Sequence, residues 1–345
     1  MTNPKIRLAV VGLGYWGPNR LRALAQLESV EIAWICDLDA PRLARFARRD
    51  PRPRTTTRIE ELLADPELDA VAISTPVFTH HRLAAQALEA GKHVFVEKPL
   101  AGSSAEAVDL VERAARAGLT LMCGHTFLYS PPVRRIKQIL DSGELGDLHF
   151  ISSSRVNLGP YRSDVSVIFD LGPHDVSILR YWLGQAPTRV SAVGRAVISP
   201  GVADVAFVDL SFPDGLLANV ELSWLSPSKL RRTVISGSRK MLVYEDGSAE
   251  PVRIYDSGIE YRDPDTFGEY QLSYRTGDIV SLRVDVTEPI VAELEDFVAA
   301  VRSGEPPESD LALALDVLRT VEAAEESMSA GGVPVDLDAA GALAG

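Results

Sequence analysis

The chain has 345 residues, of which 46% are hydrophobic, and its net charge is −13 at pH 7. That length allows two domains with separate cores, since single cores stop growing at about 250–300 residues. The negative charge argues against a nucleic-acid-binding protein, which needs cations for the phosphate backbone, and no apolar run approaches the roughly 20 residues that cross a bilayer. The N-terminal residues also lack the pattern of a signal peptide. We therefore expect a cytoplasmic protein without nucleic-acid or membrane partners.

The two cysteines give no sign of a disulfide or a metal site. Cys36 and Cys123 each close an apolar run, so both are expected to be buried, reduced strand residues. No spacing of cysteines and histidines is typical of zinc, and no metal is predicted.

The first predicted elements are an apolar strand at residues 6–11 and a helix at 20–27, joined by a glycine-rich turn. Gly12, Gly14 and Gly17 form the pattern G-x-G-x-x-G between strand and helix, which is typical of dinucleotide binding. Gly12 would allow the tight turn, Gly14 the approach of a pyrophosphate, and Gly17 close packing of the helix. The helix N-terminus would supply N–H donors to the phosphates, and the predicted cofactor site includes the intervening Tyr15 and Trp16.

Asp37 follows the second predicted strand, residues 31–36. It stands about 20 residues beyond the glycines, where an acidic side chain can hydrogen-bond the ribose hydroxyls of an adenosine. Asp39 adds a second negative charge and no basic residue follows immediately, so a 2′-phosphate would be repelled and NAD is expected rather than NADP. The alternative role for Asp37 is the N-cap of a helix predicted at 41–48.

Strands and helices alternate up to residue 123. Helices are predicted at 58–64, 79–90 and 103–117, and strands at 70–74, 94–96 and 119–123. This alternation is typical of a doubly wound parallel sheet that binds its ligand at the carboxyl ends of the strands. Thr75-Pro76 and Glu97-Lys98-Pro99 each follow such a strand, so we expect both beside the glycine turn. Taken alone, Glu-Lys-Pro could be a surface lysine before a turn proline.

Three motifs in order resemble the glucose–fructose oxidoreductase/inositol dehydrogenase/MocA (Gfo/Idh/MocA) family. They are the glycine turn, Ser74-Thr75-Pro76 with His80, and the segment from Ala90 to Pro99. The resemblance implies that the second and third motifs bind NAD through Thr75, Pro76, His80, Glu97 and Lys98, and that Lys98 is also catalytic. One departure is Val77, where the family commonly has an asparagine that bonds the cofactor.

Beyond residue 125 the pattern changes to longer segments with strand period. Strands are predicted at 148–156, 189–197, 205–212, 216–224, 233–236 and 241–244, helices at 132–140, 289–301 and 311–328, and a loop at 261–286. We predict an α/β protein with an N-terminal Rossmann domain, residues 1–124, and a C-terminal α+β domain, residues 125–345, built on a large, mainly antiparallel open sheet. In the family that this domain resembles, the open sheet face makes subunit contacts, which implies a homodimer or homotetramer.

A candidate acid–base pair precedes a helix predicted at 176–183. Asp170 and His174 resemble the family's Asp-x-Gly-x-His signature, and they share one face if the helix already begins at Asp170. A histidine suits proton transfer because its pKa lies near neutrality. In the predicted reaction His174 takes the proton of a secondary alcohol, Lys98 stabilises the alkoxide and Asp170 holds the imidazole, while the hydride goes to NAD. The alternative is that Asp170 caps the helix and His174 belongs to the core.

The substrate is predicted from weaker resemblances. Residues 125–132 and 154–159 resemble the branch that oxidises the 3-hydroxyl of UDP-linked N-acetylated sugars or their uronates, although Leu128 stands where many relatives have an arginine. Arg155, Asn157 and Tyr161 are the predicted substrate contacts. Five cations, Lys229, Arg231, Arg232, Arg239 and Lys240, could bind a diphosphate, or form a solvated sheet edge.

Other functions remain open at this point. One is an inositol or aldose dehydrogenase, or a ketosugar reductase, that acts on a free polyol or a nucleotide ketosugar. The resembled family also contains NAD-using glycosidases and cofactor-binding regulators. A regulator would be expected to lack Lys98 or His174, and this chain has both.

Overall fold

The structure is a computed structural model that describes residues 4–159, 161–162, 165–261 and 272–337. The chain forms two compact units. Residues 1–130 and 287–318 make up the first unit, and residues 131–286 and 319–345 make up the second. Each compact unit therefore contains two separate segments of the chain, whereas the sequence predicted a single boundary after residue 124. The assignment of a cofactor-binding and a substrate-binding domain stays a prediction.

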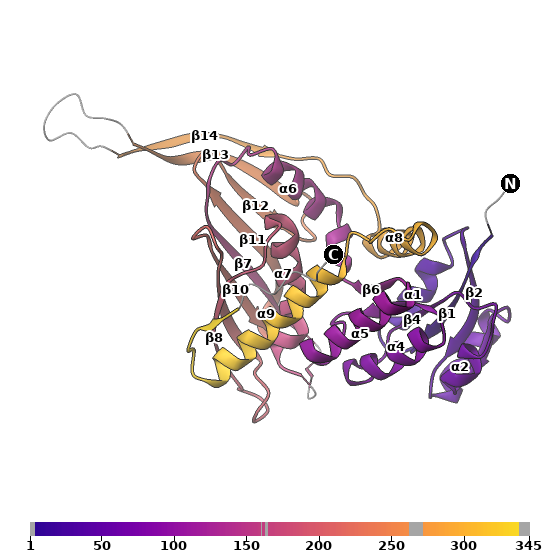
Figure 1. The fold of residues 1–345 in the computed structure, drawn as a ribbon. Helices are drawn as coiled ribbons and strands as arrows, with labels where there is room; N and C mark the ends of the chain where they lie inside the picture. The colour runs from indigo at the N-terminus through magenta and orange to yellow at the C-terminus, as the bar shows by residue number, and fades with distance from the viewer. Residues whose placement is uncertain (1–3, 160, 163–164, 262–271, 338–345) are drawn as a thin grey trace, which may run out of the picture. The chain divides into compact units, whose positions relative to one another are not determined.

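The first unit is built on a six-stranded parallel sheet, as the alternating pattern predicted. Its strand order is β3-β2-β1-β4-β5-β6 (Figure 1), and every neighbouring pair is parallel. The strands are β1 (Ile6–Val11), β2 (Val30–Cys36), β3 (Arg54–Thr56), β4 (Ala70–Ile73), β5 (His93–Glu97) and β6 (Leu121–Gly124). The three-residue β3 was not foreseen. Because β1 pairs with both β2 and β4, the strand order reverses beside the glycine turn, and ligands bind at such a point in doubly wound sheets.

Helices flank this sheet and close its core. They are α1 (Gly17–Leu24), α2 (Ala40–Arg49), α3 (Ile59–Leu63), α4 (His80–Glu89), α5 (Ser104–Ala117) and α8 (Pro289–Ser303), with two 3₁₀ turns, η1 (Val77–Thr79) and η2 (Thr126–Tyr129). Helix α5 shows how local sequence sets the ends: the Ser103 side chain accepts the Glu106 N–H, and Gly118 ends the helix with a φ of 64°. Helix α8 comes from the far end of the chain and packs on α1 and η2.

The second unit is built on a nine-stranded sheet in the order β14-β13-β12-β11-β7-β10-β9-β8-β15. Only β7 and β10 pair in parallel among its described strands. The strands are β7 (Leu148–Leu158), β8 (Arg189–Arg195), β9 (Val205–Ser211), β10 (Leu217–Ser223), β11 (Leu225–Gly237), β12 (Met241–Glu245), β13 (Val252–Tyr261), β14 (Leu272–Ser281) and β15 (Val335–Asp336). The large, mainly antiparallel sheet expected for the C-terminal half is therefore confirmed.

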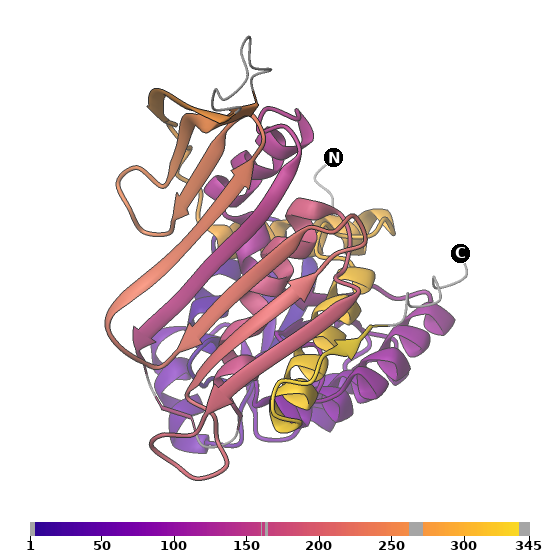
Figure 2. The same cartoon turned by 90° about the vertical axis from the view of Figure 1, so that its left-hand side faces the viewer.

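One face of this sheet is covered by helices of its own unit. Helices α6 (Pro131–Asp141), α7 (Val167–Leu183) and the later part of α9 (Leu311–Ser329) belong to this unit, and α7 packs on β7, β9 and β10. The strand period predicted for residues 216–224 is confirmed in β10 and the residue before it, since Leu216, Ala218, Val220 and Leu222 are all buried. Figure 2 shows the opposite face of the sheet.

Two expectations about this unit were wrong. The segment 261–286 was predicted to be a loop, but β14 runs from Leu272 to Ser281 and pairs with β13. Its residues carry no apolar alternation because it is an edge strand, with Tyr274 and Ile279 exposed. Helix α7 begins at Val167 rather than Val176, and it continues through Pro173.

No helix among the described residues is long and apolar enough to cross a membrane.

Candidate functional site

The glycine turn between β1 and α1 has the geometry that the sequence predicted. Gly12 has a φ of +94°, and a Cβ there would lie 2.7 Å from the carbonyl oxygen of Ser74. A Cβ on Gly17 would lie 2.1 Å from the carbonyl oxygen of Gly12. A Cβ on Gly14 would meet nothing within 4 Å, so this part of the turn is open to a ligand. The turn therefore needs glycine twice for its own backbone and leaves its middle accessible.

Tyr15 and Trp16 complete this turn. Their side chains are exposed and meet edge to face, with ring centroids 5.5 Å apart. Helix α1 begins directly after them with Trp16 as its N-cap residue, and the Trp16 side chain makes no capping hydrogen bond. The first N–H groups of α1 are thus available to a phosphate.

Asp37 follows the end of β2, and its side chain bonds the backbone of the glycine turn. Its Oδ2 accepts the Leu13 N–H at 2.6 Å and its Oδ1 accepts the Asp39 N–H at 2.8 Å. The N-cap of α2 is Asp39, whose side chain accepts the Arg42 N–H at 2.9 Å. The alternative role proposed for Asp37 is thus filled by Asp39. Each carboxylate oxygen of Asp37 instead accepts one backbone N–H.

A basic residue that the sequence analysis did not single out also lies here. Arg42 Nη1 is 3.3 Å from each carboxylate oxygen of Asp37, and Arg42 Nη2 is 3.3 Å from Asp39. The helical spacing from Asp39 to Arg42 was the signal that could have revealed it, since residues three apart are neighbours on a helix.

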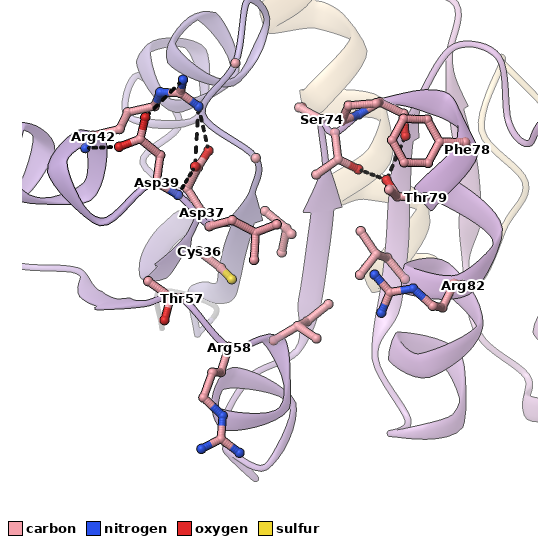
Figure 3. A pocket seen from close by; sticks show the side chains of 18 of the residues that line it. Cys36, Asp37, Asp39, Arg42, Thr57, Arg58, Ser74, Phe78, Thr79 and Arg82 are labelled. Carbon is pink, nitrogen blue, oxygen red and sulfur yellow. Dashed lines mark hydrogen bonds and ion pairs between the residues drawn. The ribbon is translucent and has the colours of Figure 1, made fainter. Parts of the chain in front are cut away.

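These residues line one side of a cavity of about 550 Å³ within the first unit (Figure 3). Gly12, Gly14, Thr75 and Pro76 belong to its wall, and Phe78, Thr79 and Arg82 lie across from Asp37. A small-molecule pocket typically measures about 300–1,000 Å³, so the cavity is large enough for an adenosine nucleotide.

His80 joins two loops of the first unit. Its Nε2 is 2.8 Å from the carbonyl oxygen of Thr75, and its Nδ1 is 2.9 Å from that of Pro99. The side chain is buried, and burial lowers its pKa. Both ring nitrogens are therefore occupied within the protein, and His80 contributes to the site by tying the Thr75-Pro76 turn to the corner after β5.

That corner carries the predicted catalytic lysine. Lys98 is half-buried, its N–H lies 3.2 Å from Glu97 Oε2, and its bond to Pro99 is cis. The Glu97 carboxylate is buried and pairs with Arg20, whose Nε and Nη2 lie 2.9 and 2.5 Å from Oε1. Glu97 thus points into the protein and supports the corner.

The predicted acid–base pair lies on α7 in the second unit. Asp170 and His174 are one helical turn apart, so they share a face, as expected if the helix began early enough. Asp170 accepts a hydrogen bond from Trp224 Nε1 at 3.2 Å and lies 3.4 Å from Arg162 Nη1. The helix is capped by Ser166, which accepts the N–H groups of Ile168 and Phe169, so Asp170 is not its cap.

The three predicted substrate contacts differ in their surroundings. Arg155 is buried and forms an ion pair with Asp175. Asn157 is half-buried, and its Oδ1 has no hydrogen-bond partner among the described residues. Tyr161 is partly exposed and its ring meets that of Trp224 at 5.4 Å. Trp224 was not foreseen, because its contact with Asp170 joins residues far apart in the sequence.

Two of the five cations in the basic cluster of the second sheet pair with carboxylates, and a third bonds a backbone carbonyl. Arg231 pairs with Asp246 at 2.7 Å, Lys240 pairs with Glu144 at 2.8 Å, and Arg239 donates to the carbonyl oxygen of Gly143. These contacts favour a solvated sheet edge over a diphosphate site for the cluster as a whole.

Comparison with protein families gives two matches. Residues 6–125 match the model described as "Oxidoreductase family, NAD-binding Rossmann fold", and residues 133–243 match the GFO/IDH/MocA C-terminal domain. Together the two models cover most of the chain.

Individual relatives are similar over nearly the whole length. The chain is 27% identical to the NAD-dependent scyllo-inositol 2-dehydrogenase of Bacillus subtilis, with 99% of each chain covered. It is 28% identical to the UDP-N-acetylglucosamine 3-dehydrogenase of Acidithiobacillus ferrooxidans, covering 92% of this chain and 98% of the relative. Among solved structures, GenD2 from gentamicin A biosynthesis, in complex with NAD, superposes with a TM-score of 0.82 at 27% identity, covering 98% of this chain and 97% of that one.

Proposed function

The chain belongs to the Gfo/Idh/MocA family of oxidoreductases, and from this premise we propose that it oxidises a secondary hydroxyl of a sugar. It is an NAD-dependent enzyme. The residues present fit that cofactor, because Gly14 leaves the turn open, α1 offers uncapped N–H groups and Asp37 lines a cavity of about 550 Å³. Tyr15, Trp16, Thr75 and Pro76 are the other proposed contacts, while Glu97 and His80 support the site from within the protein.

The observation that carries the chemistry is the pair Asp170 and His174 on one face of α7. NAD, when bound, supplies the acceptor for the hydride. His174 takes the proton of the substrate hydroxyl as general base. Asp170, with its carboxylate fixed by Trp224 and Arg162, sets the orientation of the imidazole. The ammonium group of Lys98 stabilises the developing alkoxide.

The finer proposal concerns the substrate: the 3-hydroxyl of a UDP-linked N-acetylated sugar or its uronate. The similarity to a UDP-N-acetylglucosamine 3-dehydrogenase supports it. Asn157 and Tyr161 are the proposed contacts with substrate hydroxyl groups, since the Asn157 Oδ1 still requires a hydrogen-bond donor. Arg155 remains a proposed contact, although its Nε is already bonded to Asp175.

A free polyol is the second candidate substrate. The ion pairs of Arg231 and Lys240 within the second unit leave fewer cations for a diphosphate. The similarity to a scyllo-inositol 2-dehydrogenase over the full length also supports this candidate.

The test is a panel of UDP-N-acetylglucosamine, its uronate, myo-inositol and D-xylose, each incubated with enzyme and NAD while absorbance of reduced nicotinamide is followed. NADH formation with only the UDP sugars supports the finer proposal, and formation with only the free sugars supports the second. Release of free sugar without NADH would contradict both and indicate a glycosidase.

The catalytic roles have their own test. Lys98→Ala and His174→Ala should each lower kcat by about 10²–10⁴ and leave the Kd for NAD unchanged in titrations. Lys5→Ala and His149→Ala, at exposed positions, are the matched controls. A Lys98→Ala variant with full activity would contradict the mechanism.

The open face of the second sheet supports a proposed homodimer or homotetramer. Val193 opposes Phe207 on neighbouring strands, Phe150 opposes Leu217, and all four side chains are exposed. Exposed apolar pairs of this kind favour association. Phe207→Glu should shift the mass in size-exclusion chromatography with light scattering toward the monomer, and an unchanged mass would count against this surface. The cytoplasmic location expected from the sequence stays a prediction.

A further inference from the structure

The Lys98 corner is supported by a buried arginine held between two carboxylates. Arg20 on α1 is fully buried and bonds Glu97 at 2.5 Å on one side. On its other side it pairs with Glu293 on α8, which is also fully buried. The same Glu97 lies 3.2 Å from the Lys98 N–H through its second oxygen. A continuous chain of polar contacts thus runs from α8 to the lysine.

The space around Arg20 is shaped to hold the guanidinium in one place. Its Cζ lies 4.4 Å from the centroid of the Phe95 ring. A Cβ on Gly124 would lie 2.9 Å from Arg20 Nη2 and 2.8 Å from Phe95, so the end of β6 has to be glycine for the guanidinium to fit. Thr126 Oγ1 donates to Glu293, at 3.1 and 2.9 Å from the two carboxylate oxygens. The Phe95 ring and the lack of a side chain at Gly124 thus shape the space for the guanidinium, and Thr126 holds the Glu293 carboxylate.

One guanidinium cannot neutralise two buried carboxylates. Burial, with the charge of Glu97 nearby, raises the pKa of Glu293 to about 7, although Arg20 opposes this rise. Other polar or titratable groups also face this cluster from β5, β6 and η2, namely Lys98, Cys123, His125, Thr126 and Tyr129. Stability alone does not account for this arrangement, since buried ion pairs are often no more stabilising than apolar residues of similar volume.

We propose that Arg20 and Glu293 are positioning residues for Lys98, so that helix α8 is part of the catalytic apparatus of the first unit. Arg20, held by Glu293 from behind, fixes the Glu97 carboxylate, and Glu97 fixes the backbone of the lysine corner. This proposal rests on the catalytic role proposed above for Lys98. A misplacement of about 1 Å can lower a rate by about 10²-fold, which is the scale of the effect expected here.

The competing explanation is that Glu293 only docks α8 onto α1. The chain offers a matched control for that explanation, because a second ion pair joins the same two helices at the surface. Arg22 on α1 pairs with Glu288, the N-cap residue of α8, and both side chains are about half exposed. Glu288→Ala removes a docking contact without touching Glu97. Glu295→Ala is a further control at an exposed position of α8.

The first experiment measures kcat, KM and the Kd for NAD with the best substrate of the panel. Glu293→Ala should lower kcat about 10- to 100-fold and leave the Kd for NAD within about twofold. Glu293→Gln should regain most of kcat, because its amide oxygen can still accept from Arg20. Glu293→Asp, which keeps the charge but withdraws the carboxylate by one methylene, should fold and lose kcat in the same way. Equal losses in Glu288→Ala and Glu293→Ala would overturn the proposal in favour of docking.

A second arm separates failure of this proposal from failure of the proposed function. In a Lys98→Ala background, Glu293→Ala should cause no further loss of rate, because the residue acts through the lysine. If Lys98→Ala itself keeps full activity, the proposed function fails. If Lys98→Ala is impaired and Glu293→Ala lowers its residual rate further by the same factor, only the positioning role fails.

A third arm needs no substrate. Reductive ¹³C-methylation labels the lysine amines, and the Lys98 signal is assigned by its loss in Lys98→Arg. That signal should shift in Glu293→Ala and Glu293→Asp but not in Glu288→Ala. An unchanged Lys98 signal in both Glu293 variants would overturn the proposal.

Discussion

Glu293 also makes a prediction about stability, which can be tested by replacing it with glutamine. Glu293→Gln keeps the shape of the protonated side chain and removes its ability to ionise. The pKa of Glu293 is raised from 4.5 to about 7, mainly by burial. In the unfolded chain the carboxyl group regains its ordinary pKa. The folded state therefore binds the proton more tightly than the unfolded state between these two values.

The sign and size of the effect follow from this difference. The contribution of the Glu293 carboxyl group to the unfolding free energy is fully present below pH 4.5 and is lost as pH rises through 7. Since one pKa unit corresponds to about 1.4 kcal/mol, wild type should lose roughly 2–3 kcal/mol of unfolding free energy between pH 5 and pH 8 from this group. Glu293→Gln should not lose it. The unfolding free energy of Glu293→Gln should therefore increase relative to that of wild type as pH rises.

The assay is thermal or urea unfolding of both proteins at pH 5, 6, 7 and 8, with Glu295→Gln as the control. Other titrating groups are common to both proteins, so the difference between them isolates Glu293. At roughly 2–4 °C per kcal/mol, the difference in Tm should change by roughly 5–10 °C across this range. A difference that stays constant with pH would refute the account of the buried cluster.

Three further predictions test the site. Asp37→Ala should weaken NAD binding by about tenfold or more, because it removes charge-assisted acceptors for the ribose; calorimetry should show little change for Asp39→Ala. Gly17→Ala should lower unfolding free energy by about 1–3 kcal/mol in urea titrations, since its methyl would lie 2.1 Å from the Gly12 oxygen. His125→Phe should raise Tm, because both ring nitrogens are buried without hydrogen-bond partners among the described residues. Burial and Lys98 lower the His125 pKa to about 3, so a lower Tm for the variant above pH 5 would contradict this reasoning.

Sequence reasoning succeeded where the determinants are local. The glycine turn, Asp37 and the lysine corner each follow an apolar strand directly, so their place at the carboxyl edge of the sheet was fixed by chain order. It was wrong about the start of α7, because Gly172 and Pro173 are typical of a helix end. The helix instead begins where the Ser166 side chain caps it, and it continues through Pro173.

Long-range pairs could not be foreseen in the same way. Arg20 and Glu293 stand 273 residues apart, and the sequence around either residue does not predict its contact with the other. Trp224 and Asp170 are joined across 54 residues by the register of the second sheet. Arg42 is a different case, because its helical spacing from Asp39 is sufficient to predict their contact. The hydrophobic pattern of a sequence predicts which face of a helix or strand is buried, but not which charged residues pair on that face.

The return of residues 287–318 to the first unit has a consequence for synthesis on the ribosome. The unit that starts first cannot be completed until α8 emerges, and residues 131–286 are made in between. At about 5–20 residues per second, this interval is on the order of 10–30 s. During it Arg20 has Glu97 but not Glu293, and the surface of α1 that α8 later covers stays open. The nascent first unit is therefore the stage at which chaperones would be expected to engage this chain.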